Sequence, residues 1–185
     1  MTAAAIAAPA IPRRLAGTVG LVVGFALATA LAAQLRIPLW FTPVPVTGQS
    51  FVVLAAGASL GWRAGAASQA LYLLLGVFGL PFFSGAGSGW EVLTGGTGGY
   101  LLGFVAAAAV VGLLSEAAPA HRTLGVVRAL VAGNAMIYLI GVPWLAAVTG
   151  SGLGGALRQG LLPFVVGDWL KIALVALALP AAARR

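Results

Sequence analysis

The chain has 185 residues, of which 61% are hydrophobic and only 7% are charged, and its mean hydropathy is +1.07. Soluble domains carry about 25% charged residues, so this composition excludes a water-facing surface and predicts a protein embedded in lipid. Cysteine is absent, which excludes disulfide bonds, thiolate metal sites and cysteine nucleophiles. The net charge of +7 does not indicate nucleic-acid binding, because the basic residues separate apolar runs instead of clustering with aromatic residues.

Six apolar segments follow one another along the chain and predict an all-α bundle of six transmembrane helices, in a single domain at 1–185. The second segment is shorter than the roughly 17 residues that a span needs, so we expect it to be tilted or shielded by its neighbours. The fifth contains Pro143, where a helix can break. The segments are 15–35, 48–60, 64–80, 98–114, 124–148 and 161–179.

Two connections combine turn-forming residues with aromatic side chains. Residues 36–47 contain three prolines in an extended spacing and cannot form a helix. Residues 81–97 are rich in glycine and serine, and they predict a long loop. Loops of more than about 12–15 residues are usually functional or disordered, and the aromatic residues argue against disorder. With six spans both connections fall on the outer face, where we expect them to form a lid.

The distribution of arginine predicts that both termini lie in the cytoplasm. We expect a cytoplasmic segment at 1–14, the helix bundle at 15–180 and a cytoplasmic tail at 181–185, in a protein that crosses the cell membrane several times. Seven arginines fall on the predicted inner side and two on the outer side, as the positive-inside rule requires. The inner ones are Arg13, Arg14, Arg63, Arg122, Arg128, Arg184 and Arg185, and the outer ones are Arg36 and Arg158.

Asp168 and Lys171 are ionisable residues inside the last apolar segment. A charge at the bilayer centre costs roughly 2.5–3.5 kcal/mol on insertion scales, so such residues are usually functional. Their i, i+3 spacing puts them on one helix face, where they can pair. The helix rise between Asp168 and Arg184 puts the pair in the outer half of the membrane, which predicts a polar pocket that opens outward. The structural alternative is a self-neutralising pair that locks the bundle.

Further polar and glycine residues are candidates for ligand contact. The segment at 95–104 (GGTGGYLLGF) joins the second loop to the fourth span, and its glycines either let the backbone approach a ligand or pack helices closely. Asn134 and Tyr138 lie four residues apart and share one face of the fifth span. Gln49 lies at the mouth of the second span. For these three sets of residues, ligand binding and helix packing both stay open.

Gly20, Gly24, Ala28 and Ala32 recur at intervals of four in the first span and form a stripe of small residues. Such a stripe allows close contact between helices. The helix that it contacts belongs either to this chain or to a partner subunit, and an alanine-rich helix also produces the pattern by chance.

Five motifs, in this order and spacing, resemble the BioY family, the biotin-binding substrate (S) components of energy-coupling-factor (ECF) transporters. They are PVPVTGQSFVVLAAGASLG, LYLLLGVFGLPFFSG, TGGYLLGF, IYLIGVPWL and LPFVVGDWLK, and they cover most of the chain. The resemblance implies six helices, high-affinity uptake of biotin and no enzymatic activity. It also implies a transmembrane coupling subunit and two ATPase subunits as partners. We expect no cofactor and no metal.

The resemblance carries individual residues over by position. Asp168 and Lys171 fall on the family's acidic and basic pair in the last helix, and Asn134 and Tyr138 fall on polar positions of the fifth helix. The residues that match the glycine-rich motif after the second outer loop are Thr97, Gly98, Gly99 and Tyr100. Gln49 completes the predicted binding residues. The stripe at Gly24, Ala28 and Ala32 looks like the family's docking surface for its partner.

The chemistry of biotin suits the charged pair, because a carboxylate accepts the N–H groups of the ureido ring and an ammonium meets the tail carboxylate. However, the two side chains begin only about 5–6 Å apart, which is less than the separation between the two ends of biotin. Lys171 therefore either extends toward the tail or neutralises Asp168. An intramembrane hydrolase is the main alternative, but its nucleophile needs a base within reach, and His121 falls on the predicted inner side. A scaffold protein is the third candidate.

Overall fold

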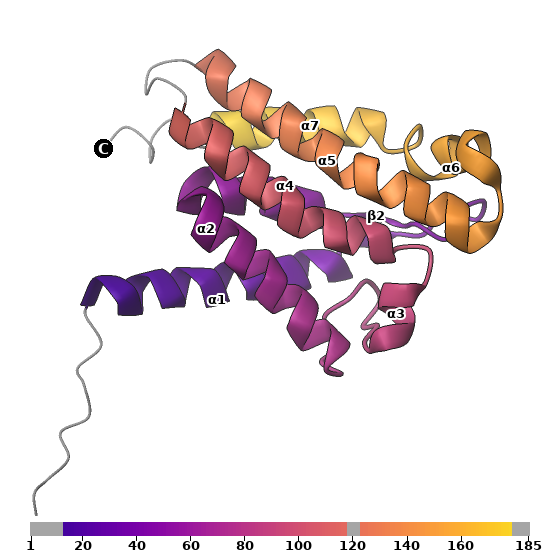
Figure 1. Cartoon of the computed structure of the whole chain (residues 1–185), viewed down its shortest axis with the longest axis horizontal. Coiled ribbons are helices and arrows are strands. Elements are labelled where there is room, and N and C mark those ends of the chain that lie inside the picture. The colour runs from indigo at the N-terminus through magenta and orange to yellow at the C-terminus, as the bar shows by residue number, and fades with distance from the viewer. Residues whose placement is uncertain (1–12, 118–122, 179–185) are drawn as a thin grey trace, which may run out of the picture.

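The computed structural model describes residues 13–117 and 123–178, so most of the predicted N-terminal segment and the whole C-terminal tail lie outside the described residues. In Figure 1, α2 lies between α1 and α4, and α5 lies between α4 and α7. The elements in chain order are α1 (Arg13–Gln34), β1 (Arg36–Ile37), β2 (Val46–Thr47), α2 (Gln49–Val77), α3 (Trp90–Thr94), α4 (Gly98–Ala117), α5 (Thr123–Thr149), α6 (Gly152–Gly160) and α7 (Val165–Ala178).

Gly61 divides α2 into two helical halves at 49–60 and 62–77, which confirms the predicted separation of the segments at 48–60 and 64–80. Its φ of 77° lies in the left-handed region, which glycine adopts without a steric penalty. The amide of Trp62 donates a hydrogen bond of 3.1 Å to Oε1 of Glu116, so one free amide at the start of the second half is satisfied. Gly65 packs against Gly57, because the second half folds back along the first.

Three segments among the described residues are long and apolar enough to cross a membrane: Leu15–Gln34, Gly98–Ala117 and Leu124–Thr149. The helices α6 and α7 meet at an angle of 51° and together form a fourth candidate. Each half of α2 is shorter than the roughly 17 residues that a straight span needs. These helices mark a membrane protein, whereas the number of six spans stays a prediction.

The structure corrects three predictions about local structure. The expected loop at 81–97 contains the single-turn helix α3, and α5 continues through Pro143 without a break. Pro143 lies on the exposed side of α5, and a helix in lipid tolerates proline where its surroundings satisfy the freed carbonyl. The last helix begins only at Val165, because a turn at 161–164 follows the unpredicted helix α6. The sequence did not predict α6 as a helix, because it is rich in glycine, which disfavours helix.

Glycines bring α4 close to its neighbours. Gly99 faces Trp144 of α5, Gly103 faces the backbone of Ile137, and Gly112 faces the backbone at the turn of α2. A Cβ at any of these positions would come within about 3.0 Å of a neighbouring atom, so the helices could not approach as they do. This close packing of α4 against α2 and α5 forms the centre of the bundle.

The two aromatic connections lie at the same end of the bundle. Figure 1 shows α3, α6 and the strands at this end, while α1 begins toward the other. The strands form a hairpin in which Arg36 pairs with Thr47 and Ile37 pairs with Val46. Residues 36–47 are therefore not helical, as predicted from their prolines.

Candidate solute-binding site

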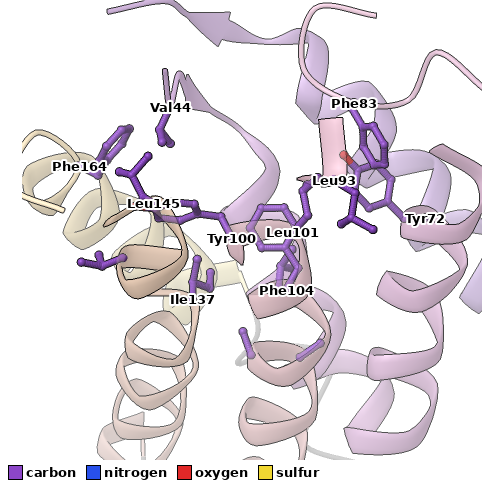
Figure 2. Packing of buried hydrophobic residues seen from close by; sticks show 14 of the residues in the cluster. Val44, Tyr72, Phe83, Leu93, Tyr100, Leu101, Phe104, Ile137, Leu145 and Phe164 are labelled. Carbon is purple, nitrogen blue, oxygen red and sulfur yellow. The ribbon is translucent and has the colours of Figure 1, made fainter. Parts of the chain in front are cut away.

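A cavity of about 240 Å³ lies between the helices and the two aromatic connections. This volume is just below the range of about 300–1,000 Å³ that small-molecule sites usually have. Figure 2 shows Val44 and Phe164 on one side of Tyr100 and Phe83 on the other, and all four residues line the cavity. The polar lining residues are Arg36, Thr47, Gln49, Ser50, Ser84, Thr97, Tyr100, Tyr138, Asp168 and Lys171.

Asp168 is the buried acid of this cavity, with 5% of its surface exposed. The first turn of α7 places it against α5, where Asn134 Nδ2 donates to its Oδ2 at 3.1 Å. The hydroxyl of Tyr138 donates to the same oxygen in a short hydrogen bond. The tertiary structure therefore joins the two polar residues of α5 to the acid of α7. These donors stabilise an ionised carboxylate that water does not reach freely.

Lys171 lies one turn after Asp168, and its Nζ is 3.4 Å from Asp168 Oδ1. The same ammonium donates a hydrogen bond of 2.9 Å to Ser50 Oγ at the start of α2. The predicted pairing of the two charges is thus confirmed, and the pair also connects α7 to α2. Because both Asp168 oxygens already have partners, the acid is held in one position before any ligand arrives.

Gln49 begins α2 and is almost completely buried. Its Nε2 donates to the hydroxyl of Tyr72 at 2.6 Å, and its Oε1 accepts a hydrogen bond from Thr47 Oγ1 at 2.9 Å. Both ends of the amide are therefore engaged within the protein. Gln49 lines the cavity from the hairpin side, where these two bonds fix its orientation.

The residues of the glycine-rich motif divide between the cavity and the helix contacts. Thr97 and Tyr100 line the cavity, and the Tyr100 hydroxyl donates to the carbonyl of Gly160 at 2.9 Å. Gly98 and Gly99 instead pack closely against Leu93 and Trp144. In the structure these two glycines allow close packing at the start of α4, which places Tyr100 beside the cavity.

The small-residue stripe of α1 has an exposed N-terminal part and a more buried C-terminal part. Gly20 and Gly24 are exposed, and a Cβ at either position would have no heavy atom within 4 Å. Ala28 is half-buried, whereas Ala32 is buried and contacts Gly48. The face of α1 that packs on α2 lies elsewhere and contains Thr29, whose hydroxyl donates to Gln69 Oε1 at 3.2 Å. The N-terminal part of the stripe is thus free of contacts with the described residues.

Sequence reasoning missed several residues of the cavity. Ser50 and Thr47 flank Gln49 in the motif PVPVTGQS, so polar residues beside an identified candidate were the available signal. Ser84 and Arg36 come from the two connections, which were predicted to form a lid without naming these two residues as binding residues. Phe164 carries no sequence signal, because its place at the cavity depends on the turn between α6 and α7.

Apolar helices of membrane-spanning length around a cavity with apolar walls and a buried, charge-paired acid define a membrane-embedded solute-binding protein. The model of the BioY family matches residues 3–185, and the chain therefore belongs to the BioY family. The predicted resemblance is confirmed.

Individual relatives agree with this assignment. The protein named biotin transporter BioY from Rhizobium etli is 37% identical over 159 residues, which cover 82% of this chain and 84% of the relative. The biotin transporter BioY from Thermotoga maritima is 39% identical over 147 residues, covering 80% of this chain and 84% of the relative. These names point to a transporter and not to an enzyme.

A solved structure has the same fold. The crystal structure of the S-component for biotin from an ECF-type ABC transporter matches with a TM-score of 0.87. The match covers 95% of this chain and 96% of that chain, at 23% sequence identity. The helix arrangement described above is therefore the fold of an S-component.

Proposed function

We propose that this chain captures biotin with high affinity as the membrane-embedded substrate-binding component of an ECF vitamin transporter. The observation that carries the proposal is the buried Asp168 carboxylate, which Asn134 and Tyr138 hold at the wall of a largely apolar cavity. The curated relatives named as biotin transporters and the S-component fold support the choice of solute.

The cavity matches the two chemical parts of biotin. A carboxylate accepts N–H groups of a ureido ring through charge-assisted hydrogen bonds, and Asp168 faces the cavity with its charge balanced by Lys171. The bicyclic ring needs apolar and aromatic walls, which side chains such as Phe83, Phe104 and Phe164 supply. Equilibrium binding of labelled biotin to the purified full-length protein in lipid nanodiscs tests the proposal directly. A folded protein that binds no biotin would reject it.

Transport fits the site better than catalysis does. A hydrolase needs a nucleophile with a base in reach, and the site has a carboxylate whose partners are an amide, a phenol and an ammonium. His121, the base considered from the sequence, lies outside the described residues. We therefore propose a binding protein that leaves its solute chemically unchanged.

We propose that the chain crosses the cell membrane six times. Both termini then lie in the cytoplasm. The spans are α1, the two halves of α2, α4, α5 and the unit of α6 and α7. The break of α2 at Gly61 supports this count, because it divides one long helix into two shorter ones that pack against each other at Gly57 and Gly65. The arginine distribution supports the orientation. The single domain then extends over 1–185.

Reporter fusions test this topology. A reporter that is active only in the cytoplasm should be active when fused after Arg185 and inactive when inserted next to Glu91, which is exposed on α3. The physical reason is that arginine resists translocation, and the predicted inner side carries most of the arginines. An insertion next to Arg63, at the turn of α2, serves as a second cytoplasmic position. Equal reporter activity at Glu91 and Arg185 would contradict the six-span arrangement.

As partners we propose a transmembrane coupling subunit, which contacts the small-residue stripe of α1, and two ATPase subunits. The exposed Gly20 and Gly24 support this, since they leave room for a second helix to approach closely. Replacing Gly24 and Ala28 by leucine should weaken co-purification with the coupling subunit and leave biotin affinity within about twofold. The matched control is Leu21→Ala on another exposed position of α1. Equal loss of biotin binding and association would place the stripe inside the bundle.

A further inference from the structure

We propose that Arg36 and Ser84 form a subsite for the carboxylate at the tail of the bound solute. The inference rests on the proposed function and extends it, because it assigns the tail to residues apart from the Asp168–Lys171 pair. Both residues line the cavity, and they come from the two aromatic connections.

The charges of the cavity lining favour an anionic ligand group. Two cations, Arg36 and Lys171, and one anion, Asp168, line the cavity, so one positive charge has no counterpart. Lys171 is paired with Asp168 at 3.4 Å, and no carboxylate of the described residues lies within ion-pair distance of Arg36. A solute with a single carboxylate would restore neutrality. Arginine suits this task because its planar guanidinium can donate two parallel hydrogen bonds to a carboxylate.

The structure positions Arg36 beside the loop that carries Ser84. The Arg36 guanidinium packs on Gly85, whose φ of 71° and missing side chain make room for it. Gln34, at the end of α1, holds the same loop through hydrogen bonds from both ends of its amide. Its Nε2 donates to the Phe83 carbonyl at 3.1 Å, and its Oε1 accepts from the Ala86 amide at 2.9 Å. The loop and the start of the hairpin are therefore fixed relative to each other.

Ser84 supplies the second observation. Its Oγ is buried and has no hydrogen-bond partner within the described residues, although it lines the cavity. A buried hydroxyl without a hydrogen-bond partner destabilises the folded protein unless water or a ligand forms that hydrogen bond. A carboxylate beside Arg36 would accept a hydrogen bond from this hydroxyl, since Ser84 directly precedes the glycine on which the guanidinium packs.

This assignment also removes the difficulty of placing both ends of biotin on one short pair of side chains. Lys171 already contacts Asp168 and Ser50, so its ammonium neutralises the acid where it lies. Asp168 then receives the ureido ring, and the loop residues receive the tail.

The experiment compares biotin with biotinol, whose tail ends in an uncharged alcohol, on the purified full-length protein in nanodiscs. Arg36→Gln should weaken biotin binding by about fivefold, because an exposed ion pair is worth up to about that factor. Biotinol affinity should change by less than about twofold, and Arg36→Lys should recover most of the loss for biotin. Ser84→Ala should cost biotin about threefold and biotinol little. Higher ionic strength should reduce the preference for biotin, because salt screens exposed charges.

The matched control is Arg158→Gln, which removes an exposed arginine that does not line the cavity and should leave both affinities unchanged. If Arg36→Gln leaves both affinities unchanged, or reduces them equally for biotin and biotinol, the subsite is rejected. The proposed binding of biotin would not be affected by this result. A wild-type protein that binds biotin and biotinol equally well would overturn it too. No binding of biotin by the wild-type protein would reject the proposed function itself, and the subsite with it.

Discussion

Replacing Asp168 by asparagine is expected to weaken biotin binding by about ten- to a hundredfold. The substitution keeps the shape of the side chain but puts an amide donor where the ureido N–H groups need an acceptor. It removes a charged hydrogen bond, which is worth roughly 1.5–3 kcal/mol, and it leaves the Lys171 ammonium without its counter-charge. At about 1.4 kcal/mol per factor of ten, these terms give the stated range. Isothermal titration of the purified variant with biotin measures the change.

The control for this variant is Glu91→Gln, because Glu91 is an exposed acid on α3 that does not line the cavity. It removes the same charge and should leave biotin affinity unchanged. The thermal unfolding of both variants shows whether they are folded. A folded Asp168→Asn protein with wild-type affinity would assign the charged pair to structure and show that the site assignment is wrong.

Replacing Lys171 by methionine is expected to weaken binding by about tenfold, with equal losses for biotin and biotinol. The ammonium contacts Asp168 Oδ1 and Ser50 Oγ, so its removal leaves a buried carboxylate without a cation and frees the start of α2 from α7. Burying an unpaired charge is unfavourable by several kcal/mol, and the acceptor loses the ammonium that holds it in place. The same ligand titrations measure the effect.

Arg128→Met is the matched control, since Arg128 is an exposed cation on α5 that lies outside the cavity lining. Its affinities should equal those of the wild-type protein. If Lys171→Met loses affinity for biotin but not for biotinol, the ammonium meets the tail carboxylate, and the role proposed for Arg36 passes to Lys171. Comparing the two ligands on both variants therefore assigns each end of the solute to one group of residues.

The sequence determined the class of the protein and the course of its long helices. A chain with 7% charged residues cannot form a soluble surface, and an apolar run of span length in lipid has to satisfy its backbone as a helix. The predicted segments at 15–35, 98–114 and 124–148 therefore lie close to α1, α4 and α5. The charged residues Asp168 and Lys171 were identified for the same reason, since charges in an apolar segment are costly and their i, i+3 spacing makes them neighbours.

Only the tertiary structure decided which of the other candidates meet. Asn134 and Tyr138 contact Asp168 because α5 packs beside α7, which no spacing along the chain reveals. Gly98 and Gly99 pack helices, whereas their neighbour Tyr100 faces the cavity, because successive residues on a helix point in different directions. The helices α3 and α6 were not predicted, because α3 has only five residues and α6 is rich in glycine, which disfavours helix. Arg36 lies against Gly85 because a contact between the two connections depends on where the helices place their ends.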